Sequence, residues 1–408
     1  MPREEKNKPK KRINSVSQGL NAVELNKQAL ALCNHGFYTN VAQAIEHLNN
    51  AVRLDPNYSP AYNNLGLAYK QKDDYDKAIE YYQKALKLDF EQVGPGHTEV
   101  AIRYNNLGIA YEYKGEYDKA IEYYQKALKM GFEQLGPEHP KIAIRFNNLG
   151  AAYGRKGDYD KAIEYYLTAL KIGLEQYGTG HVQVTTVYNN LGVAYNHKGD
   201  HFKALVYLQK ALRIDLELLG PEHPAVAALY NNLGSAYQGK GDYDRAKEYY
   251  QKALRIGLEQ SGPEHPKVAT VYNNLGSAHE EKGDYDRAIE CFEKALEIGL
   301  EQLGPQHLKV AIIHYNLGSA YEDMDDYDRA IEHYERVLEI DLDKLGPEHP
   351  EVAIRYNDLA VAYQHQGDCC RATEYFQKAL RIGLERLGEN HPHTRIFQDN
   401  LNSMRTIQ

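Results

Sequence analysis

Asparagine recurs every 42 residues along most of the chain, each time directly before a leucine. An asparagine amide offers two hydrogen-bond donors and an acceptor, so a row of such amides can bind the main chain of a peptide. Asparagine is also unfavourable inside a helix, because its amide competes with the backbone for hydrogen bonds. The alternative is that near-identical units copy an asparagine that makes hydrogen bonds between units. The residues in question are Asn64, Asn106, Asn148, Asn190, Asn232, Asn274 and Asn316.

Histidine follows the same period, in a pattern that invites comparison with a metal site. Neighbouring packed helices stand about 8–10 Å apart, far beyond a shared coordination sphere, so one metal ion cannot join two repeats. We therefore interpret these histidines as capping or turn residues and expect no metal and no cofactor. No Ser-His-Asp or Cys-His arrangement stands out either, so the sequence predicts that the chain is not an enzyme. The eight histidines are His97, His139, His181, His223, His265, His307, His349 and His391.

Charge and hydropathy restrict the kinds of partner. The 48 Lys and Arg residues against 57 Asp and Glu give a net charge of −9, which opposes a nucleic-acid partner. The basic residues between Lys8 and Arg12 predict a solvated tail, with a nuclear-import signal as the alternative. No apolar run approaches the roughly 18 residues that span a bilayer, so we expect no membrane insertion. The chain opens without a secretory signal, and its four cysteines lack disulfide or metal spacing, so we predict a cytoplasmic location.

The 42-residue period predicts one structural unit repeated in register. Leu107, Gly108 and Tyr111 fall on one narrow stripe of a helical wheel, which indicates the buried face of a first helix. We expect Gly115 to end this helix and Pro140 to open the first helix of the next unit. A second helix lies between them, and no segment predicts a strand. Each unit should therefore be a helix pair that buries its apolar face against its neighbours alone.

This unit resembles the tetratricopeptide repeat (TPR), and the resemblance covers residues 57–400. The period and the turn sequence Leu-Gly-Pro-Glu-His-Pro at residues 135–140 are similar to the longer repeats of kinesin light chains and nephrocystin-type proteins. The resemblance implies an all-α fold, an alpha-alpha superhelix (TPR solenoid) that is open and right-handed. No heptads precede the first expected helix, so the kinesin-binding function does not carry over. The positions that match the TPR pattern are Leu107, Gly108, Tyr111, Ala120, Tyr124 and Ala127.

The same patterns divide the chain into four parts. Residues 1–19 are expected to form a disordered basic tail, and residues 20–56 a TPR of the 34-residue type or a cap. Residues 57–391 contain eight units of 42-residue period. Residues 392–408 are expected to form a C-terminal capping helix, because a polar helix suits the end of a solenoid.

In TPR solenoids the first helix of each unit lines a concave groove, which places the candidate binding residues. We count positions from the repeat leucine (Leu107 in its unit). The stripe opposite the buried one holds positions −5, −1, +2 and +6, and in the family the asparagine at −1 holds a peptide backbone or a terminal carboxylate. The seven asparagines are therefore the predicted peptide-binding groove. Position +6 varies most, which predicts ligand specificity, with neutral drift as the alternative; the residues are Tyr113, Arg155, His197, Glu281 and Asp323.

The function that the resemblance implies is a protein–protein interaction scaffold or adaptor that binds an extended peptide or helix. One alternative is an architectural or self-associating solenoid, and a second is a sensor or regulatory arm that acts with a separate effector protein. A carboxylate-clamp co-chaperone is disfavoured, because Arg155 is the single clear cation on the stripe. We expect a protein or peptide ligand and a chain that is a monomer or a weak homo-oligomer.

Overall fold

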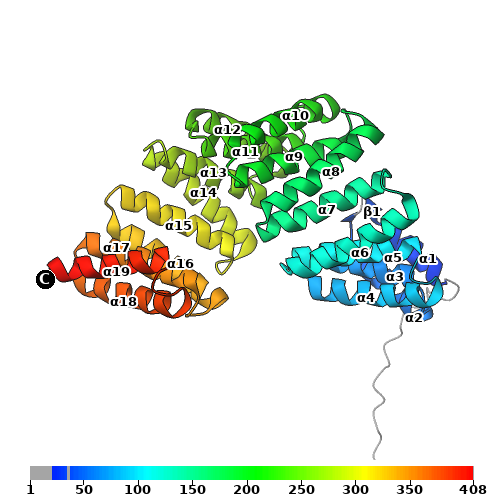
Figure 1. Cartoon of the computed structure of the whole chain (residues 1–408), viewed down its shortest axis with the longest axis horizontal. Helices are drawn as coiled ribbons and strands as arrows, with labels where there is room; N and C mark the ends of the chain where they lie inside the picture. Colours follow the sequence, from blue (N-terminus) through cyan, green and yellow to red (C-terminus); the bar gives the residue numbers. More distant parts are fainter. Residues whose placement is uncertain (1–20, 35–36, 408) are drawn as a thin grey trace, which may run out of the picture. The chain divides into compact units, whose positions relative to one another are not determined.

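The computed structural model describes residues 21–34 and 37–407, which form two compact units (Figure 1). The first unit ends at residue 179 and the second begins at residue 180. The predicted basic tail, residues 1–19, lies outside the described residues. Each unit is a succession of antiparallel helix pairs, and each helix packs most closely on the helices before and after it in the sequence.

The first unit opens with two helices and a short hairpin. Its elements are α1 Ala22–Ala31, β1 Cys33–Asn34, β2 Phe37–Tyr38, α2 Val41–Leu54, α3 Ser59–Gln71, α4 Tyr75–Gln92, α5 Thr98–Tyr113, α6 Tyr117–Leu135, α7 Pro140–Lys156 and α8 Tyr159–Tyr177. The expectation that no segment forms a strand was wrong for this hairpin. Its two strands pair antiparallel, with Cys33 opposite Tyr38. The Gln71 side chain holds it to α3 by donating to Tyr38 O and accepting from Tyr38 N, both at 2.8 Å.

The second unit continues the helix pairs at the same period. Its elements are α9 Val182–His197, α10 His201–Leu219, α11 Pro224–Gly239, α12 Tyr243–Ser261, α13 Pro266–Glu280, α14 Tyr285–Leu303, α15 Leu308–Asp323, α16 Tyr327–Leu345, α17 Pro350–Gln366, α18 Cys369–Arg386 and α19 Pro392–Ile407. The odd-numbered helices are the first helices of their repeats, and the even-numbered helices are the second.

The recurring histidines cap the first helices, as the sequence predicts. The ring Nδ1 of His139 accepts a hydrogen bond from the backbone N–H of Lys141 at 3.1 Å. The other seven histidines make the same contact with the N–H two residues later. Such caps satisfy amide groups that have no partner within the helix. Because Nδ1 must be unprotonated to accept, each cap requires a neutral imidazole.

Close packing inside a repeat depends on a glycine opposite a large ring. A Cβ atom on Gly108 would lie 2.6 Å from the ring of Tyr124, which is buried. The same pairing of Gly66 with Tyr82 and Gly318 with Tyr334 occurs in other repeats. Glycine therefore lets the two helices approach, and the ring fills the space beside it. The repeat leucines are buried on the same face.

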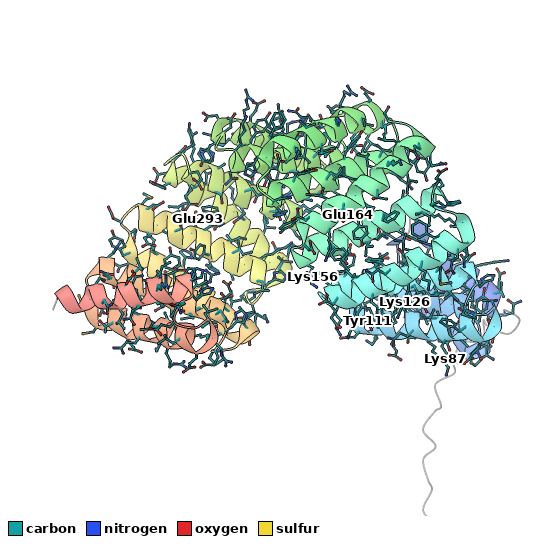
Figure 2. The ribbon with its side chains drawn as sticks, in the orientation of Figure 1. Lys87, Tyr111, Lys126, Lys156, Glu164 and Glu293 are labelled. Carbon is teal, nitrogen blue, oxygen red and sulfur yellow. The ribbon has the colours of Figure 1, made fainter. Side chains whose placement is uncertain are left out.

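A cluster of three aromatic rings lies between the two helices of most repeats. Tyr123 of α6 stacks on Tyr111 with 5.4 Å between ring centres and lies 6.0 Å from Tyr104. The Lys126 ammonium group stands 5.0 Å from the centre of the Tyr123 ring. Figure 2 labels Tyr111 and Lys126 on these neighbouring helices. Each cation–π contact of this kind contributes about 0.5–1 kcal/mol at an exposed site.

One repeat carries histidines at two of these ring positions. In α15 and α16 the Nδ1 atoms of His314 and His333 lie 2.9 Å apart, and the His333 ring stacks on Tyr321. Burial lowers the pKa of each histidine to about 4, helped for His314 by the neighbouring His333 and Arg336. A contact of this length needs one N–H donor and one unprotonated acceptor, so the protein holds both rings neutral.

Candidate protein-binding surface of the first helices

The predicted groove asparagines join successive repeats. In the second unit, Asn274 Nδ2 donates to Asn231 Oδ1 at 3.0 Å, across 43 residues of sequence. Each bond links position −1 of one repeat to position −2 of the preceding repeat. It uses one of the two amide hydrogens, and all these side chains except the buried Asn26 and Asn64 are half-buried. Equivalent bonds join Asn106 to Asn63, Asn148 to Asn105, Asn232 to Asn189 and Asn316 to Asn273, and Asn64 donates to Asn26 of α1.

These asparagine pairs establish the inter-repeat role that the sequence left as one of two alternatives. Peptide binding by the same amides stays a prediction. Each amide group donates one hydrogen atom to its neighbour and still carries a second one. At the joint between α15 and α17 the pair is replaced by Tyr315 and Asp358. Burial raises the pKa of the Asp358 carboxyl to about 6, although the Arg355 guanidinium opposes this shift.

In the first unit, the predicted specificity residues Tyr113 and Arg155 lie together. Arg155 lies over the Tyr113 ring at 5.4 Å, and Tyr113 stacks on Tyr75 of the preceding repeat. The Arg155 Nε atom also forms an ion pair with Glu112 at 2.8 Å. Glu112 in turn accepts from the Tyr124 hydroxyl at 2.7 Å. Arg155 is therefore held by the protein itself, although about half of its side chain is exposed.

In the second unit, Glu281 and Asp323 occupy neighbouring repeats and His197 lies at the end of α9. The Tyr243 hydroxyl donates to Glu281 at 3.2 Å, and Asp323 is exposed. Both acids raise the pKa of Glu280, a residue that sequence reasoning missed. Burial raises the pKa of Glu280 to about 7, and repulsion from Asp323 and Glu281 adds to the shift, whereas Ser319 opposes it.

Glu280 has an unusual environment because its usual tyrosine partner is absent. In three other repeats position +5 accepts a hydrogen bond from a second-helix tyrosine: Glu112 from Tyr124, Gln238 from Tyr250 and Glu322 from Tyr334, at 2.7–2.9 Å. The residue equivalent to that tyrosine beside Glu280 is Phe292, which has no hydroxyl. One carboxylate oxygen of Glu280 is consequently buried without a partner. Comparing position +5 and the facing second-helix position across the repeats could have identified Glu280 from the sequence.

Three depressions follow one another on the first-helix face of the second unit. They lie between α11 and α13, α13 and α15, and α15 and α17, with volumes of about 160, 310 and 380 Å³. Residues at positions −5 and −1 line the first two, and Ile312 at position −5 also lines the third. In the first two these residues are Ala228, Asn232, Thr270, Asn274 and Ile312. The remaining lining is largely aliphatic.

The floor of each depression is one residue of the intervening second helix. Gly257 and Gly299 line the first two depressions, and Asp341 lines the third. Two of the three floors thus carry no side chain. Ile312 separates the second and third depressions and is 55% exposed, and Leu308 beside it is 48% exposed. Exposed aliphatic residues beside hollows are typical of protein-contact surfaces.

The residue at this floor position, glycine or aspartate, packs against a side chain of the next first helix. Asp341 pairs with Arg355 at 3.0 Å, and in the first unit Asp89 pairs with Arg103 at 2.9 Å. Opposite Gly131, the Arg145 guanidinium fills the space of the missing side chain and donates to Ala127 O at 2.7 Å. Gly131 therefore gives the guanidinium group room to pack closely against the second helix.

Two kinds of feature are absent among the described residues, a metal-holding group and a membrane-spanning helix. Across residues 21–34 and 37–407, no three His, Cys, Asp or Glu side chains are grouped so that they could hold a metal ion. Within the same residues, no helix has the length and apolar character needed to cross a membrane. The surface described above is suited to hydrogen bonding and apolar contact with another chain.

Comparisons with known proteins agree with the repeat architecture. A family profile described as "Tetratricopeptide repeat" matches residues 57–131, 132–182, 183–259, 227–301, 267–343 and 309–385, and a second, described as "TPR repeat", matches residues 40–73. Superkiller protein 3 from Schizosaccharomyces pombe is 48% identical over 44 residues, which are 11% of this chain and 3% of that protein. The chain thus spans a small fraction of this curated relative.

A solved structure of a bacterial protein shares the fold. The quorum sensor NprR from B. thuringiensis superposes with a TM-score of 0.61 at 18% identity, covering 88% of this chain and 97% of that one. A lower TM-score of 0.45, which carries no weight for the fold, is found for a putative kinesin light chain from Podosopora anserina with nearly identical TPR-like repeats, at 23% identity over 51% of this chain and 98% of that one. The predicted class, an all-α alpha-alpha superhelix of TPR type, is confirmed. The chain belongs to the tetratricopeptide repeat family.

Proposed function

We propose that this chain is a protein-interaction scaffold without catalytic activity, and that the first-helix face of its second unit binds an extended segment of a partner protein. The row of three depressions between α11 and α17 carries the proposal. The first two combine a glycine with an amide group at position −1, and exposed Ile312 lies between the second and the third. A scaffold whose repeats are already joined loses little conformational freedom on binding, which favours affinity.

The spacing of the depressions constrains the ligand. Successive first helices lie roughly 10 Å apart, and an extended chain in the polyproline II conformation advances about 9 Å in three residues, which brings its side chains back to the same face. An extended segment that follows the row would therefore place every third side chain over a depression. The asparagines at position −1 stand between these hollows, and their second amide hydrogens can donate to the carbonyl groups of the segment. Exposed Ile312 then packs between two ligand side chains.

Peptide selection on the intact chain tests this proposal. Peptides selected from a random 12-residue library should carry apolar side chains at every third position. They should lose binding to a variant with Ala228→Arg, Thr270→Arg and Ile312→Arg, because these exposed positions can accept arginine without disturbing the core. Charged rims then replace the apolar walls of all three depressions.

A matched variant controls for added charge. Gln251→Arg, Gln377→Arg and Leu384→Arg add the same three charges at exposed positions of second helices. The selected peptides should bind this control as they bind the unmodified chain. Equal binding to both variants would place the ligand on another surface and defeat the proposal. So would a selection that enriches no sequence.

A further inference from the structure

A ladder of ion pairs joins successive repeats at the turns between first and second helices. In the second unit, the carboxylate of Asp244 at the start of α12 pairs with the Lys282 ammonium group at 3.0 Å. The lysine lies 38 residues after the acid, at the end of the next first helix. The same pairs in the first unit are Asp76 with Lys114 at 2.9 Å and Asp118 with Lys156 at 2.6 Å. We call the turns at residues 198–203, 240–245, 282–287 and 324–329 the turn edge of the second unit.

Two joints of the second unit lack this pair, and each lacks the opposite half of it. Phe202 occupies the acid position at the start of α10, which leaves Lys240 after α11 without a carboxylate. Met324 occupies the cation position after α15, which leaves Asp286 at the start of α14 without a cation. Among the residues that the structure describes, neither Lys240 nor Asp286 has an ion-pair partner. The charge that one joint retains is therefore the charge that the other joint has lost.

Both substitutions also leave an apolar side chain in contact with water. Phe202 is 74% exposed and Met324 is 44% exposed. Single exposed apolar residues and unpaired surface charges are common, so neither joint alone indicates a partner. The two joints differ from such isolated residues because they complement each other in both charge and apolar surface. Exposed Asp323 and Asp325, on either side of Met324, add to the negative charge of the second joint.

The spacing of the two joints suits a two-fold contact. They lie two repeat periods apart in the sequence, and the complete pair of Asp244 with Lys282 occupies the joint between them. Two copies of the turn edge that meet in opposite directions bring the first joint of each copy onto the second joint of the other. Such an isologous contact uses every complementary group twice.

We propose that the turn edge of the second unit pairs with the same edge of a second copy of this chain. Lys240 of each copy forms an ion pair with Asp286 of the other, and Phe202 packs against Met324. The contact is weak and depends on salt, because exposed ion pairs contribute little and are screened. Its residues do not line the depressions between α11 and α17, so it does not depend on the proposed function.

Sedimentation equilibrium of the full chain, with a reducing agent present, measures this association. In about 50 mM salt the average mass should rise with concentration from the 46.5 kDa of one chain towards twice that value, and about 500 mM salt should reduce the rise. Phe202→Asp combined with Met324→Lys copies the other repeats and completes both ion pairs within the chain. This variant should keep the mass of one chain at every concentration while its helical circular dichroism is retained.

Reversal of charge tests the contact between copies. Lys240→Glu sets like charges against each other at both ends of the dimer and should weaken association at least about tenfold. Adding Asp286→Lys restores opposite charges across the contact and should restore the dimer. Arg213→Glu makes the same change of charge at an exposed site in the middle of α10 and should leave association unchanged. The proposal fails if the unmodified chain stays monomeric in low salt, if Lys240→Glu leaves a dimer intact, or if the double reversal associates no better than Lys240→Glu.

Discussion

The asparagine pairs between repeats should contribute measurable stability, and the pair of Asn274 with Asn231 is a suitable test. Its hydrogen bond is 3.0 Å long and joins two half-buried side chains. A neutral hydrogen bond contributes about 1 kcal/mol net, within a range of roughly 0.5–1.5 kcal/mol. Asn274→Ala alone also gains up to about 0.7 kcal/mol of helix propensity, which masks part of the loss.

A double-mutant cycle removes this masking, because the propensity term cancels. Asn231→Ala, Asn274→Ala and the double variant should give a coupling energy of about 1 kcal/mol. Repeat arrays can unfold in parts, so the free energy should be read from native-state hydrogen exchange of amides in α11–α14 and checked by urea unfolding.

A second cycle supplies the control. Asn231 and Asn316 belong to different pairs, because Asn316 donates to Asn273. Their alanine variants should therefore be additive within about 0.3–0.5 kcal/mol. If the free-energy changes of Asn231→Ala and Asn274→Ala also add, the asparagine pair does not hold the repeats together. The recurrence of asparagine in most repeats would then need another cause.

Three further outcomes follow from the buried groups. The free energy of unfolding should fall as pH drops from 7 towards 4. The folded-state pKa values of His314 and His333, about 4, lie below the unfolded value near 6.5, so the unfolded chain takes up protons first. Urea unfolding at several pH values measures this dependence, and His333→Tyr should flatten it. Phe292→Tyr should give Glu280 a hydrogen-bond donor and lower the pKa of Glu280 from about 7, so it should stabilise the chain more at pH 8 than at pH 5. If an NMR titration finds the pKa of Glu280 unchanged in this variant, the missing tyrosine hydroxyl does not explain the raised pKa. Gly108→Ala should cost about 1–3 kcal/mol in urea unfolding, because its Cβ meets a buried ring at 2.6 Å, and a neutral result would show that this ring moves freely.

Much of the fold could be predicted from the sequence, because each repeat uses local signals. The pattern of Leu107, Gly108 and Tyr111 defines the buried stripe, and the recurring histidine and proline mark where first helices begin. The hairpin of Cys33–Asn34 and Phe37–Tyr38 escaped this reasoning. Two-residue strands have no readable alternation, and this hairpin is held by a distant side chain, that of Gln71.

The candidate site was only partly predictable for a related reason. A helical wheel identifies the face on which Asn274 lies, but not the neighbour that its amide meets in the preceding repeat. The floor pairs are different, because Asp89 with Arg103 and Asp341 with Arg355 have a constant separation that comparison of the repeats can reveal. Whether such a carboxylate has an arginine partner depends on one residue, because Leu229 takes the arginine's position for Asp215. The division after residue 179 has no counterpart in the repeat pattern.

The asparagine pairs also make the repeats interchangeable. A typical 42-residue block carries both halves of the bond, the acceptor at −2 and the donor at −1, so the end of one block fits the start of another. A gene that loses or duplicates a whole block would therefore encode a chain in which the asparagine bond can form at the new junction. Insertion of a single residue has no such tolerance, because it would move the donor off the matching face. Tyr315 and Asp358 interrupt this rule, and the order of the blocks on either side of that joint is accordingly fixed.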